Sequence, residues 1–373
     1  MLFKLINTDQ ITFSNPDIFC ALNNLLTAYR ECKHILFSEE RIFKKISESS
    51  DFDSLNKHAA LAAHKDRRRN NSLFSSINTY VIVDFSTPEN FHKTKNENEN
   101  ENENNIISVG YKYFSDSSRI QPAKLLCEDL SDTEFYTIIA DFYKKKNKLG
   151  YTGLDFETVN GGGGSIKYNF EKISNQQKLC LCILDSDKKH PNDKLGSTCS
   201  GFKEEITSFS SDFYILNAHE AESLIPSPII EELIRNGIYG QEKCVEFDKL
   251  DSIEKKDPKT KIYYDHKEGF TIKKLTSLSK YPPKDFWWDV IQNNRNFKQT
   301  KCLRDKTCEC TPPCSVSVGF GSKLLEHSIP SLKLKSASKI GEMLTPTLKK
   351  EWISVGRKLF SWGCTNSKSI RTS

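Results

Sequence analysis

Long apolar runs are missing from this chain. No stretch approaches the roughly 18 uncharged apolar residues that a membrane-spanning helix needs. The first thirteen residues also lack the basic region and apolar core of a signal peptide. Apolar residues make up 37% of the chain, a lean content that still allows packed cores. We therefore expect a cytoplasmic protein without a membrane partner.

The chain has twelve cysteines but no secretory signal, so we expect thiols in a reducing compartment rather than disulfides. Four of these cysteines fall within thirteen residues, at Cys302, Cys308, Cys310 and Cys314. Their spacing is not that of paired CxxC motifs. Two interpretations stay open for residues 302–314: a zinc knuckle with four thiolate ligands, or free thiols on a loop.

A strong excess of one charge is also absent, since the whole chain has a net charge of only +5. The distribution is uneven, however. Residues 271–373 contain 19 basic and 7 acidic side chains, a net charge of +12, which leaves −7 for the rest. Such a basic region suits a polyanion such as DNA or RNA, although a lysine-rich solvated surface would look the same.

The length of 373 residues predicts two or three domains. Residues 1–120 are interpreted as an α+β module, with helices at 19–29 and 39–46 and strands at 79–85 and 106–114. Residues 94–105, rich in Asn and Glu and without apolar side chains at their core, are expected to form a disordered loop.

Residues 121–230 change to alternating strands and helices. Apolar segments predict strands at 124–129, 154–159, 178–184 and 213–216, with helices at 131–146, 166–173 and 202–209 between them. This order predicts an α/β domain with a central parallel sheet. Residues 231–373 are expected to form a mostly helical, basic C-terminal region, with helices near 231–236 and 285–293.

Acidic side chains follow three of these predicted strands, where functional groups of parallel sheets gather. They are Glu128, Asp132, Asp185, Asp187, Glu220 and Glu222. Carboxylates that converge on one edge repel each other unless hard cations neutralise them, and Mg²⁺ prefers oxygen ligands. Because residues i and i+2 of an extended segment point the same way, we expect Asp185 and Asp187 to share a cation. The alternatives to a metal site are a DxD sequence in a surface loop and glutamates that only begin a helix.

Three segments together resemble a known family. Leu-Leu-Cys-Glu128-Asp-Leu-Ser-Asp132, a strand running into the glycines 161–164, and Ile-Leu-Asp185-Ser-Asp187 are similar to the Toprim domain. The segment His-Glu220-Ala-Glu222-Ser is similar to the acidic motif of OLD-type and related anti-phage Toprim nucleases. The resemblance covers residues 121–228, and it implies a Rossmann-like Toprim fold.

The resemblance implies a metal-dependent endonuclease that hydrolyses phosphodiester bonds in DNA or RNA, acting in antiviral defence. It implies Mg²⁺ or Mn²⁺ as cofactor, with two ions. Asp185 and Asp187 would hold the first ion and Asp132 and Glu222 a second. Glu128 would act in general acid–base chemistry or as a ligand, and Glu220 is the substitute for Glu222.

Other residues are assigned less directly. We expect the phosphate near the backbone of Gly162 and Gly163 and near the ammonium of Lys188. The alternatives are that the glycines form a flexible turn and that the lysine is only solvated. Asp129 replaces the glycine that usually follows the first glutamate, which adds bulk and charge there. No GxxxxGK[ST] sequence is present, so any ATPase would be a partner protein.

Two other functions remain open. A primase-like nucleotidyltransferase would use the same fold and cations. A non-catalytic nucleic-acid-binding protein would combine the basic C-terminal region with a degenerate Toprim site. The sequence leaves the oligomeric state undecided, a homo-oligomer included.

Overall fold

The N-terminal part is built on a five-stranded sheet that is mostly parallel. The computed structural model describes residues 1–39, 41–97 and 103–367. The strand order is β2-β1-β3-β5-β4, and within the described ranges β4 runs antiparallel to β5 while the other pairs are parallel. The strands are β1 (Leu2–Ile6), β2 (Ile35–Ser38), β3 (Thr79–Asp84), β4 (Phe91–Glu97) and β5 (Glu103–Gly110).

Helices pack on this sheet, beginning with the helical connection between β1 and β2. Apolar residues at helical spacing bury one face of α1 (Pro16–Arg30), and the side chain of Asn15 caps its first turn. The remaining helices of this part are α2 (Ile42–Glu48), α3 (Ser54–Lys65) and α4 (Arg67–Asn71). A parallel sheet with helical crossovers differs from the α+β module expected from the sequence.

A second, four-stranded sheet forms the middle of the molecule, and its strand pairs are parallel. Its order is β10-β9-β6-β8, from β6 (Lys124–Cys127), β8 (Glu157–Asn160), β9 (Cys180–Leu184) and β10 (Ser211–Ile215). All residues of β9 are buried, as its continuous apolar run predicts. The α/β fold class expected for this region is confirmed.

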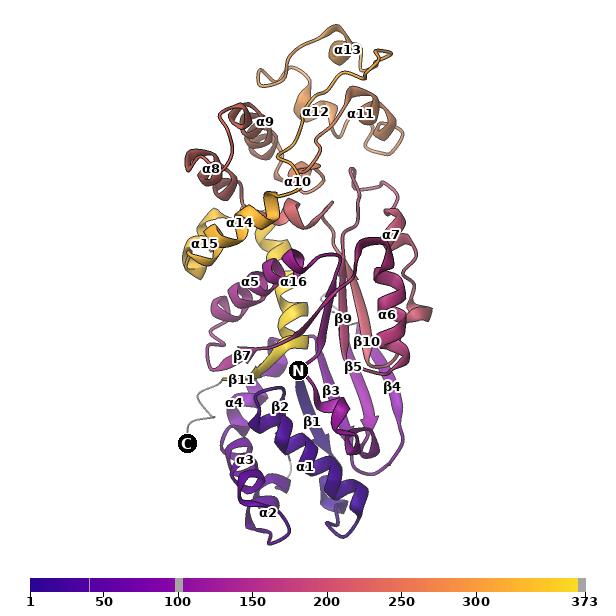
Figure 1. Cartoon of the computed structure of the whole chain (residues 1–373), viewed down its shortest axis with the longest axis vertical. Coiled ribbons are helices and arrows are strands. Elements are labelled where there is room, and N and C mark those ends of the chain that lie inside the picture. Colours follow the sequence, from indigo (N-terminus) through magenta and orange to yellow (C-terminus); the bar gives the residue numbers. More distant parts are fainter. Residues whose placement is uncertain (40, 98–102, 368–373) are drawn as a thin grey trace.

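Helices pack on both faces of this second sheet. In Figure 1, α6 (Ile166–Asn175) lies on one face, and α5 (Leu130–Lys146) with α16 (Pro346–Gly363) lies on the other. The chain closes with β11 (Cys364–Asn366), which pairs with β7 (Thr152–Leu154) in a small antiparallel sheet. The last part of the described chain therefore packs against the middle of the molecule.

A buried charge cluster joins the two larger sheets. Asp212 on β10 accepts a hydrogen bond from Asn105 on β5 at 3.1 Å. Its carboxylate also lies 3.0 Å from the ammonium of Lys93 on β4 and 2.6 Å from that of Lys358 on α16. Burial alone would raise the pKa of Asp212, but the two ammonium groups lower it. The pairing holds the edges of both sheets together.

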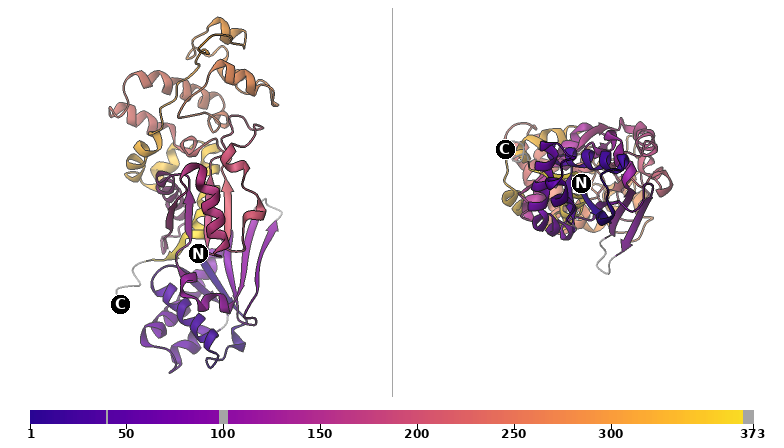
Figure 2. Two further views of the ribbon diagram at one scale, coloured as in Figure 1. Left: turned by 45° about the vertical axis from the view of Figure 1, so that its right-hand side comes forward. Right: turned by 90° about the horizontal axis from the view of Figure 1, so that it is seen from below.

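The segment after β10 forms a helical lobe at one end of the elongated molecule (Figure 2). Its helices are α8 (Ser227–Arg235), α9 (Glu242–Lys256), α10 (Pro258–Lys261), α11 (Ile272–Leu278), α12 (Trp288–Ile291) and α13 (Lys301–Arg304). Two more, α14 (Leu324–Lys333) and α15 (Ala337–Met343), return the chain to α5. Across the described ranges, no helix is both long and apolar enough to cross a membrane.

Four local expectations were wrong. The strand expected at 154–159 is divided between β7 and β8, which belong to different sheets. The helix expected at 202–209 is replaced by the short α7 (Ser197–Ser200) and a 3₁₀ turn at Glu204–Ile206. Phe202 contacts the ring of Phe170 while Phe209 stacks on Phe91, so the two aromatic residues face different neighbours.

The other two errors concern strand and helix ends. Residues 111–114, expected in a strand, belong to a 3₁₀ turn at Tyr111–Ser115, and of residues 285–293 only Trp288–Ile291 is α-helical.

The structure of residues 94–105 also differs from the prediction at both ends of this segment. Residues 94–97 and 103–105, expected within a disordered loop, belong to the β4–β5 hairpin, which pairs residue 97 with residue 103. Backbone hydrogen bonds form this ladder, so it does not require apolar side chains. The remaining residues of the expected loop, 98–102, lie outside the described residues.

Candidate metal centre

The carboxyl ends of the four strands of the second sheet meet at one edge. Register pairs Leu184 with Ile215 and Cys127 with Asn160, so the strands end at the same level. The segments that continue from these ends begin at residues 128, 161, 185 and 216. Parallel pairing thus brings together the acidic segments and the glycine run.

A negatively charged group surrounds Asp185, directly after β9. Burial and the nearby charges of Asp132 and Glu222 raise the pKa of Asp185 well above its ordinary value. Burial, aided by Glu222, raises the pKa of Asp132 to about 7, and burial with Glu222 raises that of Glu220 to about 7. The structure therefore brings Asp132, Asp185, Glu220 and Glu222 into one electrostatic cluster, which we call the acidic cluster.

Lys267 enters this acidic cluster from the segment between α10 and α11. Its Nζ lies 3.2 Å from Oε2 of Glu220 and 3.1 Å from Oε2 of Glu222. Partial burial opposes its charge, but Glu220, Glu222 and Asp185 raise the pKa of Lys267 above its ordinary value. One ammonium therefore offsets part of the charge of several carboxylates. Nothing in the sequence analysis pointed to Lys267.

The two glutamates of the acidic cluster are both buried but differ in their partners. Glu220 precedes a 3₁₀ turn at Ala221–Leu224, and its Oε1 accepts a hydrogen bond from the backbone N–H of His266 at 3.0 Å. Glu222 lies inside that turn. Because one oxygen of Glu220 is already engaged by the backbone, Glu222 has more freedom to bind a cation.

The extended backbone on which the predicted sharing of one cation by Asp185 and Asp187 depended ends at Asp187. The backbone of Asp187 is left-handed, with φ 56°, and the alternation of an extended strand ends there. The side chain of Asp187 is exposed. Its charge contributes instead to the raised pKa of the partly buried Glu128, after burial itself. Glu128 and Asp187 form a second acidic pair beside the acidic cluster.

Asp129 has a structural role that explains its presence beside the site. It is the N-cap of α5: Oδ1 accepts from the N–H of Ser131 at 3.1 Å, and Asp132 Oδ2 accepts from the N–H of Asp129 at 2.9 Å. The Asp129 side chain is exposed, and its backbone is extended, with φ −130°. Any residue adopts that conformation, so the fold does not require glycine at this position.

The glycine run after β8 approaches the sheet closely at its first residue. A Cβ on Gly161 would lie 2.6 Å from the carbonyl oxygen of Cys127. Gly162 and Gly163 have φ of 68° and 56°, and a Cβ on Gly163 would meet no atom within 4 Å. The backbone of Gly163 is therefore open to its surroundings at the same edge of the sheet.

The two lysines after the second aspartate differ. The Nζ of Lys189 pairs with Asp265, whereas no ion pair is found for Lys188 among the described residues. Lys188 therefore remains the better candidate for a phosphate contact.

A second group, His219, Glu220 and Asp265, places one ligand atom from each residue within 4.8 Å of the others, so it could hold a metal ion. Asp265 Oδ2 already contacts Lys189 and lies 3.8 Å from His219 Nε2, while the buried Nδ1 of His219 has no hydrogen-bond partner in the described part of the chain. Although burial raises it, the neighbouring His219 and Lys189 lower the pKa of Asp265 below its ordinary value. This arrangement is typical of an ion-pair network. Among the described residues, no other trio of the acidic side chains brings ligand atoms this close.

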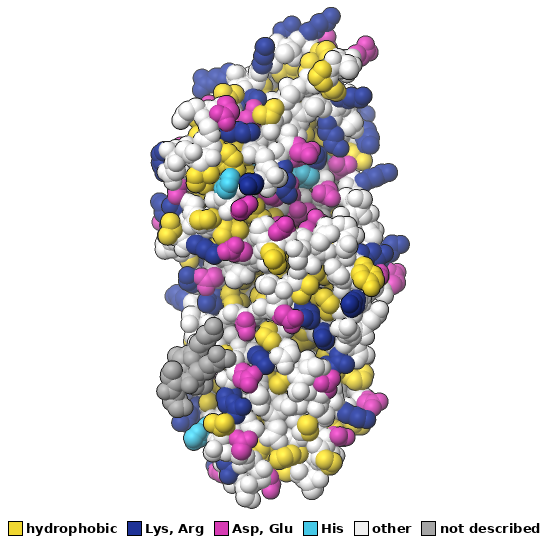
Figure 3. Space-filling view, in the orientation of Figure 1, with side chains coloured by type: hydrophobic (Ala, Val, Ile, Leu, Met, Phe, Trp, Pro, Cys, Tyr) yellow, Lys and Arg dark blue, Asp and Glu magenta, His cyan; other side chains and the backbone are white. Residues whose placement is uncertain are grey.

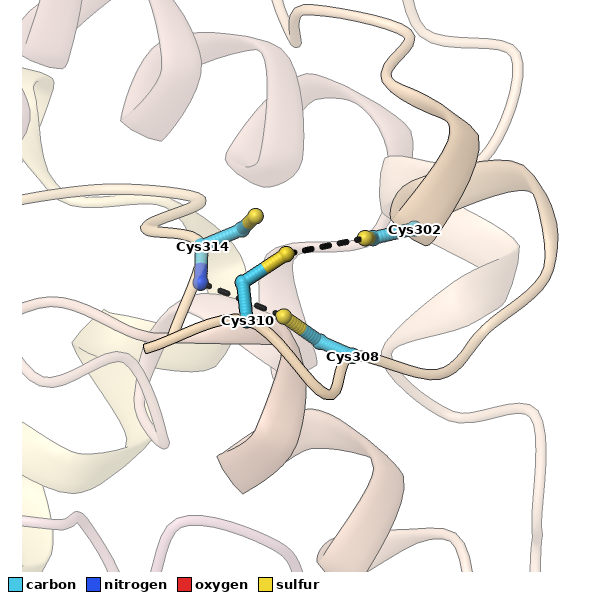
Figure 4. A group of neighbouring side chains, drawn as sticks. All are labelled: Cys302, Cys308, Cys310 and Cys314. Atoms are coloured by element: carbon cyan, nitrogen blue, oxygen red, sulfur yellow. Dashed lines mark hydrogen bonds between the residues drawn. The ribbon is translucent and has the colours of Figure 1, made fainter. Parts of the chain in front are cut away.

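The four cysteines of residues 302–314 come together (Figure 4), and α13, which carries Cys302, lies at the end of the helical lobe in Figure 1. Their sulfurs all lie within 4.8 Å of one another, and the group could bind zinc. The Sγ atoms of Cys302 and Cys310 are 3.8 Å apart, and Cys308 Sγ accepts a hydrogen bond from the N–H of Cys314 at 3.3 Å. All twelve cysteines of the chain are free thiols.

No protein-family model, curated protein or solved structure matches this chain. The interpretation of the acidic edge therefore depends on its own geometry and charge.

The raised pKa values predict that the stability of the metal-free protein falls as pH rises. Asp132 and Glu220 have pKa values near 7, against ordinary values of 3.8 and 4.5. The stabilisation from protonation is complete below the ordinary values and is lost as the pH rises through about 7. In EDTA, we expect the free energy of urea unfolding to fall on the order of 3 kcal/mol from about pH 5 to about pH 8.

Mg²⁺ should reduce this pH-dependent fall in the free energy of unfolding, since a bound cation would replace the protons. Asp185→Asn should also flatten it, because one of the repelling charges is removed. Equal unfolding free energies at both pH values in EDTA would contradict the electrostatic description of the acidic cluster.

Proposed function

We propose that this protein is a divalent-cation-dependent nuclease of the Toprim type. The observation that carries the proposal is the convergence of Asp132, Asp185 and Glu222 at the carboxyl edge of a parallel sheet, with Glu128 and Asp187 beside them. Negative charge that one ammonium offsets only in part favours a hard cation in a partly buried site. The family resemblance described above supports the same reading.

The donor set fits Mg²⁺ or Mn²⁺, because its members offer carboxylate oxygens alone. Asp185, Asp132 and Glu222 would hold one ion once their side chains move closer, because their ligand atoms do not all lie within 4.8 Å of one another here. Glu128 with Asp187 would hold a second. Bound there, the ions would neutralise negative charge on the scissile phosphate and the leaving oxygen.

The chain's own residues supply the other requirements of phosphodiester hydrolysis. Burial and Asp187 raise the pKa of Glu128, which brings this carboxyl nearer to the range useful for proton transfer. The open backbone of Gly163 and the ammonium of Lys188 lie in segments that leave the same edge. They would orient the phosphate, while Lys267 would offset the charge of the buried glutamates.

The basic residues of the helical lobe support nucleic acid as the substrate class. Eight basic side chains of residues 271–304 are exposed: Lys273, Lys274, Lys280, Lys284, Arg295, Lys298, Lys301 and Arg304. Figure 3 shows basic side chains over this end of the molecule. A surface of this charge attracts the phosphate backbone of DNA or RNA irrespective of sequence.

One observation favours a second function. Lys267 already contacts both buried glutamates, which is what a site that had lost its cation would show. In that case the protein would bind nucleic acid through its basic lobe without cutting it. Lack of cleavage, with binding that does not depend on Mg²⁺, would identify this function.

The proposed function is tested by incubating the purified chain with plasmid, linear DNA and tRNA. Parallel reactions contain Mg²⁺, Mn²⁺ or EDTA, and none contains nucleoside triphosphates. We expect cleavage of at least one substrate with Mg²⁺ or Mn²⁺ and none with EDTA. Cleavage in EDTA, or incorporation of labelled nucleotides in place of cleavage once triphosphates are added, would contradict the nuclease proposal.

A further inference from the structure

The loop that carries three of the four clustered cysteines has few other contacts, chiefly those of Lys306 with Thr276 and Asp285. Apart from Pro312 and Pro313, which are exposed, residues 304–314 contain no aliphatic or aromatic side chain. Eight of these eleven residues are exposed, and the partly buried ones are Lys306, Cys308 and Cys314. Hydrophobic burial therefore cannot offset the entropy lost when this loop is ordered. Two of its three cysteines, Cys308 and Cys314, are among the partly buried residues.

The sulfur positions match a tetrahedral thiolate site. Zn²⁺ binds thiolate sulfur at about 2.3 Å, which places two sulfurs of a tetrahedron about 3.8 Å apart. Cys302 and Cys310 are separated by 3.8 Å, and all four sulfurs lie within 4.8 Å of one another. A disulfide would instead bring two sulfurs to about 2.05 Å.

The backbone around the cluster favours a thiolate. The N–H of Cys314 donates to the sulfur of Cys308, as the dashed line in Figure 4 shows. Donors of this kind stabilise the charge of a metal-bound sulfur.

We propose that Cys302, Cys308, Cys310 and Cys314 bind one Zn²⁺ ion that orders the tip of the helical lobe. Four thiolates complete the tetrahedral shell and leave no position for water or substrate, so the ion is structural. This site is separate in the chain from the acidic cluster and does not depend on the proposed nuclease activity.

The ion would connect α13 to the strand-like segment that follows the loop. That segment pairs with the start of α11: Ser315 forms a β-bridge with Thr271, and the N–H of Ile272 donates to the carbonyl of Cys314 at 2.9 Å. Thr276 Oγ1 donates to the carbonyl of Lys306 at 2.7 Å. Zn²⁺ would thus fix α11 and α13, which carry exposed basic side chains, relative to each other.

The test begins with the zinc content of the full chain, purified under reducing conditions without chelator. Elemental analysis should give close to one zinc per chain. Cys308→Ser and Cys310→Ser should each lose most of it, whereas Cys20→Ser, an exposed cysteine of α1, should keep it. Less than about one tenth of an equivalent of zinc in the parent protein, or iron in its place, would overturn the proposal.

Two further measurements apply even if the serine variants fail to fold. Titration of the parent protein with a mercurial reagent should release one zinc as four thiols react. Replacement by Co²⁺ should give the sulfur-to-cobalt charge-transfer and visible bands of a tetrahedral thiolate site. Disulfides among these four cysteines in the intact mass, or an octahedral cobalt spectrum, would contradict it. Neither measurement uses nucleic acid, so the outcome is independent of the nuclease test.

Discussion

Asp185→Asn is expected to lower cation-dependent cleavage by more than about 100-fold. Such a loss would exceed the roughly 10- to 100-fold loss that is usual for residues that only hold metal ligands in place. Asp185 directly follows β9, and its charge is coupled to Asp132, Glu222 and Lys267. Loss of its negative charge removes the centre of the acidic cluster. Cleavage of the substrate identified above, measured over a range of Mg²⁺ concentrations, gives the effect.

The fold should survive this substitution. Asn has nearly the same shape, and removal of one of several repelling charges should leave the free energy of unfolding in EDTA unchanged or higher. The matched control is Asp9→Asn, which alters an exposed aspartate in the N-terminal part and should cleave like the parent. Cleavage within a few-fold of the parent by Asp185→Asn would remove this residue from the mechanism.

Lys267→Met should destabilise the protein in EDTA and make it respond more strongly to Mg²⁺. The substitution leaves Glu220 and Glu222 buried without the ammonium that lies about 3 Å from both. Because the Lys267 side chain is 35% exposed, we expect a loss of about 1–3 kcal/mol, below the value for a fully buried pair. Urea unfolding in EDTA measures this loss.

Mg²⁺ should restore the stability of Lys267→Met, and its apparent affinity should rise by about tenfold because a competing cation has been removed. Lys255→Met is the matched control, since Lys255 pairs with Asp251 on an exposed surface and such pairs contribute little. A Lys267→Met protein as stable as the parent in EDTA, with no gain in Mg²⁺ response, would show that Lys267 does not neutralise the site.

The α/β architecture of the second sheet followed from sequence patterns. The fully buried β9 is a continuous apolar run, and the helices α5 and α6 show apolar residues at helical spacing. Parallel pairing then places the segments after these strands at one edge, which is why the acidic segments could be located without coordinates. The identity of that sheet as a Toprim domain stays a prediction.

Other features depended on contacts that the sequence does not encode locally. Lys267 reaches the acidic cluster from a different part of the fold, in a segment that follows α10. The left-handed backbone of Asp187 ends the extended conformation on which its pairing with Asp185 was predicted. The split of residues 154–159 between two sheets depends on β11, about 200 residues later in the chain.

Cysteine spacing was a different kind of signal, because four thiols within thirteen residues can meet through the folding of one short loop. The sequence left both zinc and free thiols open there. The 3.8 Å distance between Cys302 and Cys310, together with the lack of buried apolar side chains in the loop, favours the metal.

Anomalous diffraction from crystals grown with Mn²⁺ tests the central claim most directly. We predict a Mn²⁺ peak at the carboxyl edge of the second sheet, in contact with Asp185 and with Asp132 or Glu222, and Lys267 displaced from at least one glutamate. A map without manganese at this edge, in which the Lys267 ammonium still contacts Glu220 and Glu222, would contradict the assignment of this edge as a metal centre.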